Sequence, residues 1–322
     1  MTKENTLITQ GIINLNKPEK WTSHDCVAVM RGIIGMKRIG HTGTLDPMAT
    51  GVLPICLGTT TRIMEYMDLD FKTYECEMKL GLETDTQDIW GQILNTSPIE
   101  HITEDDVRRA FAPFHGTISQ IPPKYSAVKI DGKRLYEYAR EGKEVTVKSR
   151  EIYIKELLVN KICLEEGRIT YTVTCSKGTY IRTICQDVGE SLGCGATMSR
   201  LTRVKSGIFS IENAIDMEDL KKMEKDQIPS LLTDTDKPLV NFGKIVFNQD
   251  RAAYFCNGGH IRLEDATIVS QPVYKTMESH ITIRDEYRKA YNIYNEQKVF
   301  LGVAFYDEGR NRLIADKVFY RG

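Results

Sequence analysis

A chain of 322 residues is long enough for about two domains of ordinary size. Its composition, with 41% hydrophobic and 27% charged residues, is that of a folded globular protein and excludes a disordered or fibrous chain. No run approaches the about 20 apolar residues that a membrane helix needs, and residues 1–10 lack a signal-peptide core. We therefore expect a cytoplasmic protein that does not enter the membrane.

Charge is balanced over the whole chain but sorted along it. Lysine and arginine number 43 and aspartate and glutamate 44, so the net charge of −1 gives no general attraction to nucleic acid. Residues 121–150, however, carry eight basic and four acidic side chains, and three cations without an acid lie in residues 200–205. Such segments are typical of RNA-facing patches and equally of solvated helix faces, and charge alone does not distinguish the two.

The N-terminal part of the sequence predicts a helix, a loop and a strand. Thr22 or Ser23 can cap a helix whose apolar residues recur at helical spacing up to Ile34. Residues 35–51 are too rich in glycine and proline for a helix and are expected to form a loop. From Tyr74 onward apolar and polar residues alternate, which predicts a half-buried strand.

The next part of the sequence mixes helices and strands in the same way. Acidic residues after Thr103 mark the first turn of a helix, and residues 169–175 alternate as a strand. The turn at 176–178 then leads into a helix that carries Ile181 and Val188 on its apolar face. Because there is no regular βαβ repeat, we expect an α+β (mixed α/β) fold with a largely antiparallel sheet.

The C-terminal part predicts a second, smaller domain. Residues 230–237 are rich in Ser, Thr, Asp and Pro and are expected to form a linker. Beyond it, the runs 299–305 and 313–319 flank a turn at 307–310, the pattern of a β-hairpin. We place the domains at 1–235 and 243–322.

The segment Gly40–Gly51 is the strongest candidate for a functional loop, because it gathers glycines and hydroxyls around the carboxylate of Asp46. Pro47 keeps Asp46 out of the α region, and the glycines permit close approach of a ligand. A structural turn in which Asp46 bonds to its own backbone is the alternative. Phosphate-loop, HExxH, GxSxG and CxxC motifs are missing, and the eight cysteines are expected to be reduced thiols.

Five ordered blocks of the sequence resemble the bacterial tRNA pseudouridine synthase B (TruB) family. Together they span most of the first 210 residues. The blocks are GIINLNKPEKWTS (Gly11–Ser23), GHTGTLDPMATGVLPICLG (Gly40–Gly58), KTYECEMKLGLETDTQDIWG (Lys72–Gly91), QIPPKYSAVKIDGKRLYEYAREG (Gln120–Gly142) and CSKGTYIRTICQDVGESLGCGA (Cys175–Ala196).

The resemblance implies catalytic roles for Asp46, Tyr74 and Arg182. Asp46 would attack the target nucleoside, at the base or at the sugar, so that the glycosidic bond breaks and the uracil re-attaches through C5. Tyr74 would stack on the flipped uracil and take part in proton transfer, although its place on the apolar face of a strand also fits a core residue. Arg182 would pair with Asp46.

The same resemblance implies substrate-binding roles for His41, Tyr74, Tyr180 and Leu201. Tyr180 can reach the same pocket as Arg182 if it lies at the start of the helix rather than within it. Leu201 matches an apolar pocket residue. His41 precedes the catalytic loop, where a structural hydrogen-bonding histidine is the alternative.

Basic residues are expected to contact phosphates, which position RNA without reading its sequence. Asn16, Glu19 and Lys20 depart from the usual first block, and Arg62 stands where the family usually has lysine. The expected phosphate contacts are Lys17, Arg62, Lys124, Arg134, Arg140, Arg203 and Lys205.

The resemblance thus implies a pseudouridine synthase core followed by a small β-barrel-like PUA domain, divergent at 268–297. The implied substrate is the uridine at position 55 in the T arm of tRNA. We expect no metal, no cofactor and no obligatory protein partner, since isomerisation has no redox or net hydrolysis step. A pseudouridine synthase for another structured RNA, and a non-catalytic RNA-binding or RNA-folding module, are the alternatives.

Overall fold

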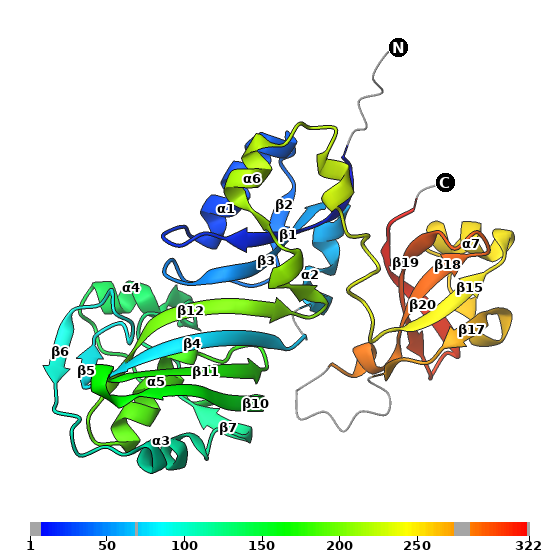
Figure 1. The fold of residues 1–322 in the computed structure, drawn as a ribbon. Helices are drawn as coiled ribbons and strands as arrows, with labels where there is room; N and C mark the ends of the chain where they lie inside the picture. The colour runs from blue at the N-terminus through cyan, green and yellow to red at the C-terminus, as the bar shows by residue number, and fades with distance from the viewer. Residues whose placement is uncertain (1–7, 68–69, 274–283, 321–322) are drawn as a thin grey trace.

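The computed structural model describes residues 8–67, 70–273 and 284–320. Within them the chain forms a ten-stranded sheet and, toward the C-terminus, a separate six-stranded sheet (Figure 1). In these residues no helix is both long enough and apolar enough to cross a membrane. Of the segment 268–297, for which a divergent pattern was predicted, residues 274–283 lie outside the described residues.

Residues 10–222 supply the large sheet, two small hairpins and the helices around them. In chain order the elements are β1 (Gln10–Lys17), α1 (Ser23–Ile34), β2 (Ile39–His41), β3 (Thr50–Gly58), α2 (Met64–Met67), β4 (Lys72–Leu80), β5 (Leu82–Thr84), β6 (Ile93–Thr96), α3 (Glu104–Phe111), β7 (Gly116–Gln120), β8 (Lys129–Ile130), β9 (Lys133–Arg134), α4 (Leu135–Arg140), β10 (Arg150–Cys163), β11 (Arg168–Cys175), α5 (Ile181–Ser191), β12 (Ala196–Ser206), β13 (Phe209–Ser210), β14 (Ile215–Asp216) and α6 (Met217–Lys222).

The large sheet has the strand order β14-β1-β3-β12-β4-β11-β10-β7, with β2 added to β3 and β13 to β12. Its pairs are antiparallel except β1 with β14 and β3 with β12. The predicted mixed α/β fold with a largely antiparallel sheet is confirmed. Helices α3 and α5 pack against each other and against the half of the sheet formed by β4, β10, β11 and β12 (Figure 1). A large part of the main hydrophobic core lies between these helices and the sheet.

Two helices begin where the sequence predicts them. The hydroxyl of Thr22 accepts a hydrogen bond from the Asp25 amide at 3.0 Å, and the Asp25 carboxylate accepts one from the Thr22 amide at 2.8 Å. Thr103 and Asp106 form the same reciprocal pair at the start of α3. Each pair satisfies two backbone donors that a helix start would otherwise leave unpaired.

The smaller domain is a curled sheet with one helix against it, and it is PUA-like. Its strands follow the order β16-β20-β19-β18-β15-β17. The predicted hairpin near the C-terminus is confirmed as β19 and β20. In chain order the elements are β15 (Gly243–Phe247), α7 (Gln249–Cys256), β16 (Ile261–Arg262), β17 (Thr267–Ser270), β18 (Ala290–Asn295), β19 (Phe300–Asp307) and β20 (Arg312–Val318).

The two sheets are joined by a shared hydrophobic cluster rather than by a loose linker. Tyr66 of the large domain packs edge-on against Phe242 and Tyr287, with ring centroids 5.2 Å and 5.5 Å away. Its hydroxyl donates to the Asp316 carboxylate of β20. The predicted linker at 230–237 is itself held, because Thr233 exchanges two backbone hydrogen bonds with Ile12 of β1 at 2.8 Å and 2.9 Å. The domain boundary at 235–243 stays a prediction.

We predict that Tyr66→Ala lowers the free energy of unfolding by about 3–5 kcal/mol, the usual cost of emptying a buried aromatic site. Tyr66 is 3% exposed and removing its ring opens the cluster between the domains. Calorimetric unfolding of the variant measures the loss. Tyr254→Ala, at a tyrosine of the small domain that is 54% exposed, is the matched control. Equal losses in both variants would contradict a structural role for the junction.

Candidate active site

Asp46 lies in the loop between β2 and β3, and its neighbours fix the loop backbone. The Ser23 hydroxyl accepts from the Leu45 amide at 2.9 Å and lies 3.2 Å from the Leu45 carbonyl. The Asp46 carbonyl accepts from the Ala49 amide at 3.0 Å, closing a turn. The Asp46 side chain is 40% exposed. The backbone of Asp46 thus forms the turn, while its carboxylate remains open to solvent.

Lys17 is a buried support of this loop, which contradicts the predicted phosphate contact. Its side chain is 0% exposed, and the Nζ donates to the carbonyls of Pro18 at 2.8 Å, Trp21 at 2.6 Å and Pro47 at 3.4 Å. Three carbonyl acceptors match the three donors of an ammonium group. Burial lowers the pKa of Lys17 to about 8, which leaves it mostly protonated at neutral pH.

Arg203 supports the loop from the other side, and here too the predicted phosphate contact is wrong. The side chain is 1% exposed, its Nε donates to the Val52 carbonyl at 2.7 Å, and its Nη2 donates to the Gly43 carbonyl at 3.2 Å. Gly51 lets the loop approach β12 this closely, since a Cβ there would lie 2.2 Å from the Arg203 carbonyl oxygen. A phosphate cannot reach this buried guanidinium.

Arg182 lies at the first turn of α5 and pairs with Asp46. Its Nη2 is 3.0 Å from the Asp46 carboxylate, the ion-pair contact that the resemblance implies. The guanidinium is almost fully buried and also donates to the carbonyls of Thr86 at 2.9 Å and Tyr125 at 3.1 Å. Asp88 lies 3.7 Å away on the other side, and burial raises the pKa of that carboxyl. Arg182 therefore has a fixed orientation and holds the Asp46 carboxylate in place.

Tyr74 lies on the central strand β4, opposite Arg203 in the register of β4 with β12. Burial raises the pKa of its phenol, while the charge of Arg203 acts in the opposite direction. The hydroxyl is therefore protonated at neutral pH. The Tyr74 side chain is only partly buried, so its place on the strand does not seal it in the core.

Tyr180 lies at the start of α5, and Leu201 lies on β12. Tyr180 caps α5 two residues before Arg182, and its amide and carbonyl bond to the Gln120 side chain at 2.8 Å and 3.0 Å, so the predicted place at the helix start is confirmed. Leu201 is buried on β12, where its carbonyl lies 3.5 Å from the hydroxyl of Thr50 at the end of the catalytic loop. Their substrate contacts stay predictions.

His41 is half-buried before the loop, and its imidazole is neutral. Burial, the nearby His24 ring and the charge of Arg203 together lower its pKa to about 4. The His24 ring packs edge-on at a centroid distance of 5.4 Å. The Gly43 amide donates to His41 Nδ1 at 3.4 Å. This contact fits the structural alternative, and a neutral ring remains able to contact RNA.

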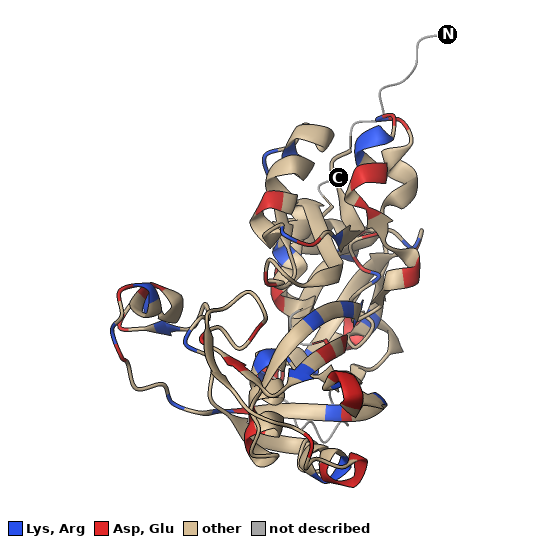
Figure 2. Cartoon of the chain, turned by 60° about the vertical axis from the view of Figure 1, so that its left-hand side comes forward, with Lys and Arg blue, Asp and Glu red and all other residues tan. Residues whose placement is uncertain are grey.

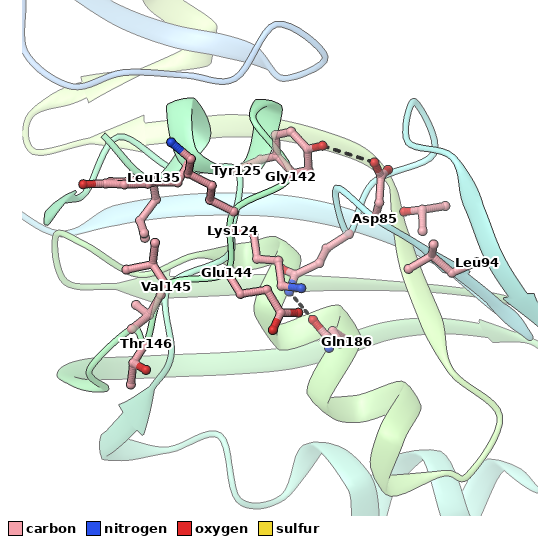
Figure 3. A pocket seen from close by; sticks show the side chains of 16 residues that line it. Asp85, Leu94, Lys124, Tyr125, Leu135, Gly142, Glu144, Val145, Thr146 and Gln186 are labelled. Carbon is pink, nitrogen blue, oxygen red and sulfur yellow. Dashed lines mark hydrogen bonds between the residues drawn. The ribbon is translucent and has the colours of Figure 1, made fainter. Parts of the chain in front are cut away.

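A cavity of about 640 Å³ is lined by the β5–β6 hairpin, α4 and residues 142–147 (Figure 3). Asp85, Gln87 and Tyr125 line it, and the carbonyls of Thr86 and Tyr125 are the ones that hold Arg182. The Tyr125 hydroxyl bonds to Asp85 at 3.4 Å across the cavity. The basic segment 121–150 is thus physically connected to the Asp46–Arg182 pair.

The remaining predicted phosphate contacts divide into two kinds. Arg62 joins the two domains, because its Nη1 donates to the Val318 carbonyl at 2.8 Å and its guanidinium lies 5.3 Å from the Phe319 ring centroid.

Lysine and arginine are interspersed with acidic residues along the ribbon in Figure 2, so no single charged face is evident there. Lys124, Arg134, Arg140 and Lys205 are exposed and stay predicted phosphate contacts.

The sequence did not predict several residues that support the site. Ser23 was considered only as a helix cap, although its hydroxyl holds Leu45. Thr86 and Tyr125 act through backbone carbonyls, which any residue type supplies. Asp88 and Gln120 lie inside blocks that resemble the family, which was the signal available, and their burial is seen only in the structure.

Comparisons with known proteins agree with this architecture. Residues 31–181 match the model for the TruB family pseudouridylate synthase N-terminal domain, and residues 182–240 match the tRNA pseudouridylate synthase B C-terminal domain. A chain of an H/ACA ribonucleoprotein bound to a substrate RNA containing 2'-deoxyuridine shares the fold, with a TM-score of 0.70 at 22% identity, over 97% of this chain and 85% of that chain.

Curated relatives are more similar in sequence. The tRNA pseudouridine synthase B of Clostridium perfringens is 41% identical over 92% of this chain and 95% of that protein. The protein of the same name from Clostridioides difficile is 39% identical, over 96% and 99%, and that of Bacillus cytotoxicus is 43% identical, over 79% and 85%.

The matched family models and the curated relatives show that this fold belongs to the class of pseudouridine synthases, here with a PUA-like C-terminal domain. Within that class, the chain belongs to the TruB family of pseudouridylate synthases.

We predict that His41 makes the folded protein less stable as the pH falls. Its pKa is about 4 in the folded state, against an ordinary value near 6.5, so the unfolded chain binds more protons between these two values. Stability due to the neutral ring is fully present above about pH 6.5 and is lost as the pH falls toward 4. In His41→Asn, which keeps an acceptor for Gly43, this part of the pH dependence should disappear.

Urea unfolding between pH 4 and pH 7 measures the effect. We expect the wild type to lose about 1–2 kcal/mol more than the variant across this range, a value discounted because the ring is only half-buried. His101→Asn, at an exposed histidine, is the control for replacing a histidine side chain. Parallel curves for wild type and His41→Asn would contradict the neutral assignment.

Proposed function

We propose that this protein is a tRNA pseudouridine synthase that isomerises the T-loop uridine at position 55. The observation that carries the proposal is the Asp46 carboxylate, open to solvent and held at 3.0 Å by the buried Arg182. Membership of the TruB family supports it, as do curated relatives named tRNA pseudouridine synthase B. The enzyme is then an isomerase.

Asp46 is the reacting group in this proposal. Its carboxylate attacks the uridine, at the base or at the sugar, and the C1′ to N1 glycosidic bond breaks. The uracil then re-attaches to C1′ through C5, C5 loses a proton to a base and N1 gains one, and the Asp46 carboxylate is released unchanged. Arg182 contributes by orientation, because a nucleophile is effective only when held about 3 to 3.5 Å from its target. The reaction adds and removes no atoms and needs no metal or cofactor.

The surrounding side chains bind the base in this proposal. A uridine must leave its stack to reach Asp46, at a cost of a few kcal/mol. The ring of Tyr74, with Tyr180 and Leu201, offsets that cost by stacking and apolar contact. Because the Tyr74 phenol is protonated at neutral pH, it can donate the proton that N1 needs after the glycosidic bond breaks. His41 contacts the RNA as a neutral ring.

Positioning of the tRNA falls to the exposed cations Lys124, Arg134, Arg140 and Lys205 and to the PUA-like domain. These cations bind phosphates of the T arm, which fixes the position of the RNA without reading its sequence. The location that follows for an enzyme acting on tRNA is the bacterial cytoplasm, and the proposal includes no obligatory protein partner.

One experiment separates this function from its alternatives. Purified protein is mixed with unmodified tRNA, with a second structured RNA, and with tRNA in which uridine 55 is replaced by cytidine, and pseudouridine is detected by chemical labelling. Conversion of uridine 55 in tRNA supports the proposal. Conversion only of the other RNA favours a synthase with a different substrate, and binding without conversion favours a non-catalytic RNA-binding module.

We predict that Asp46→Asn lowers turnover at least about 1,000-fold while tRNA affinity stays within about threefold, since affinity rests mainly on phosphate contacts. Single-turnover conversion and equilibrium binding measure the two effects. Asp105→Asn, at an exposed carboxylate of α3, is the control for loss of charge. Residual turnover above about one per cent would remove Asp46 from its role.

We predict that replacing Lys124, Arg134 and Arg140 by glutamine makes tRNA binding less dependent on salt. Each phosphate contact contributes roughly 0.7–0.9 to the slope of log affinity against log salt, so the slope should fall by about 2 to 3. Arg108→Gln with Arg109→Gln, at exposed arginines of α3, is the control. An unchanged slope in the triple variant would assign the segment to a solvated surface.

A further inference from the structure

The turn between β5 and β6 exposes a concentrated apolar surface. Trp90 is 48% exposed and Ile89 45%, and on β6 Ile93 and Leu94 are 65% and 67% exposed. A tryptophan ring is the largest apolar side chain, and exposing it to water is unfavourable. Contiguous exposed apolar groups of this kind mark interaction surfaces.

The turn that presents Trp90 is rigid. The Trp90 amide donates to the Asp88 carboxylate at 3.1 Å, and the Ile89 amide donates to the Met198 carbonyl of β12 at 3.0 Å. Gly91 closes the turn where a Cβ would lie 2.3 Å from the Thr86 hydroxyl, so a side chain is excluded there. The indole is therefore presented from a fixed backbone and is not a loosely held surface group.

The inner side of this turn belongs to the active site. The Asp88 carboxylate lies 3.7 Å from Arg182, whose guanidinium lies 3.0 Å from Asp46. The turn that holds Arg182 thus carries Trp90 two residues after Asp88. Leu94 lines the same cavity as Lys124, from the basic segment (Figure 3). One short turn thus carries the exposed indole of Trp90 and, through Asp88, contacts the arginine that pairs with Asp46.

We infer that Trp90 binds RNA by stacking its indole on an unpaired nucleobase next to the uridine that enters the Asp46 cleft. This inference rests on the proposed function. Extrusion of a uridine uncovers the faces of the neighbouring bases. An aromatic ring beside phosphate-binding cations is the combination that binds single-stranded nucleotides, because every base has a π face. Trp90 covers such a face and so contributes to substrate affinity rather than to the chemical step.

Two variants separate stacking from simple apolar contact. Trp90→Phe keeps an aromatic ring, whereas Trp90→Leu keeps apolar area without one. With unmodified tRNA as substrate, Trp90→Leu should raise KM about tenfold with kcat within about twofold, and Trp90→Phe should stay within about threefold of wild type. Leu158→Ala, at an apolar residue of β10 that is 54% exposed, is the control and should behave as wild type.

Fluorescence provides a second readout, because the chain has two tryptophans, Trp21 and Trp90. In Trp21→Phe, with folding checked by circular dichroism, the remaining emission comes from Trp90. Adding tRNA should quench it, and adding heparin, which has charge but no bases, should not.

Each contrary outcome has a distinct meaning. A Trp90→Leu variant that turns over tRNA as wild type does, a Trp90→Phe variant as weak as Trp90→Leu, or emission unchanged by bound tRNA would overturn the inference. So would loss of self-association in Trp90→Leu with tRNA binding intact, which would make the surface a contact between copies. If the wild type neither binds nor converts tRNA, the proposed function itself falls, and the inference falls with it.

Discussion

The geometry of the site depends on the burial of one arginine. A guanidinium removed from water is stable only when its charge is paired and its N–H groups have acceptors. Arg182 meets this requirement with the carboxylate of Asp46 and the carbonyls of Thr86 and Tyr125. Three segments distant in the sequence must therefore meet at α5. Displacing any one of them would leave a buried charge or donor without its partner, so Arg182 couples the Asp46 loop to the β5–β6 turn and the basic segment.

Burial also explains why cations of similar sequence context have opposite roles. Lys17 and Arg203 are buried and donate to backbone carbonyls, so they support the Asp46 loop. Lys124 and Lys205 are exposed and remain available to an anion. A sequence shows the charge of each residue but not its burial, which depends on tertiary packing. The assignment of Lys17 and Arg203 to phosphates failed for this reason.

Local signals in the sequence predicted the local structure well. The Thr22 and Thr103 caps are reciprocal hydrogen bonds between neighbours, and the C-terminal hairpin follows from a turn between two strand-like runs. The pairing of Asp46 with Arg182 has no local signal, and it came from resemblance to a family. Thr86 and Tyr125 could not be found in either way, since their carbonyls are common to all residues.

The two partners of the ion pair differ in their exposure to water. The Arg182 side chain is 6% exposed and the Asp46 side chain 40%, so the arginine is already desolvated while the carboxylate still faces water. In the proposed reaction, a base next to Asp46 takes the place of that water and lowers the local dielectric, which strengthens the attraction between the two groups. The Arg182 side needs no rearrangement for this, because its contacts with the Thr86 and Tyr125 carbonyls are already made.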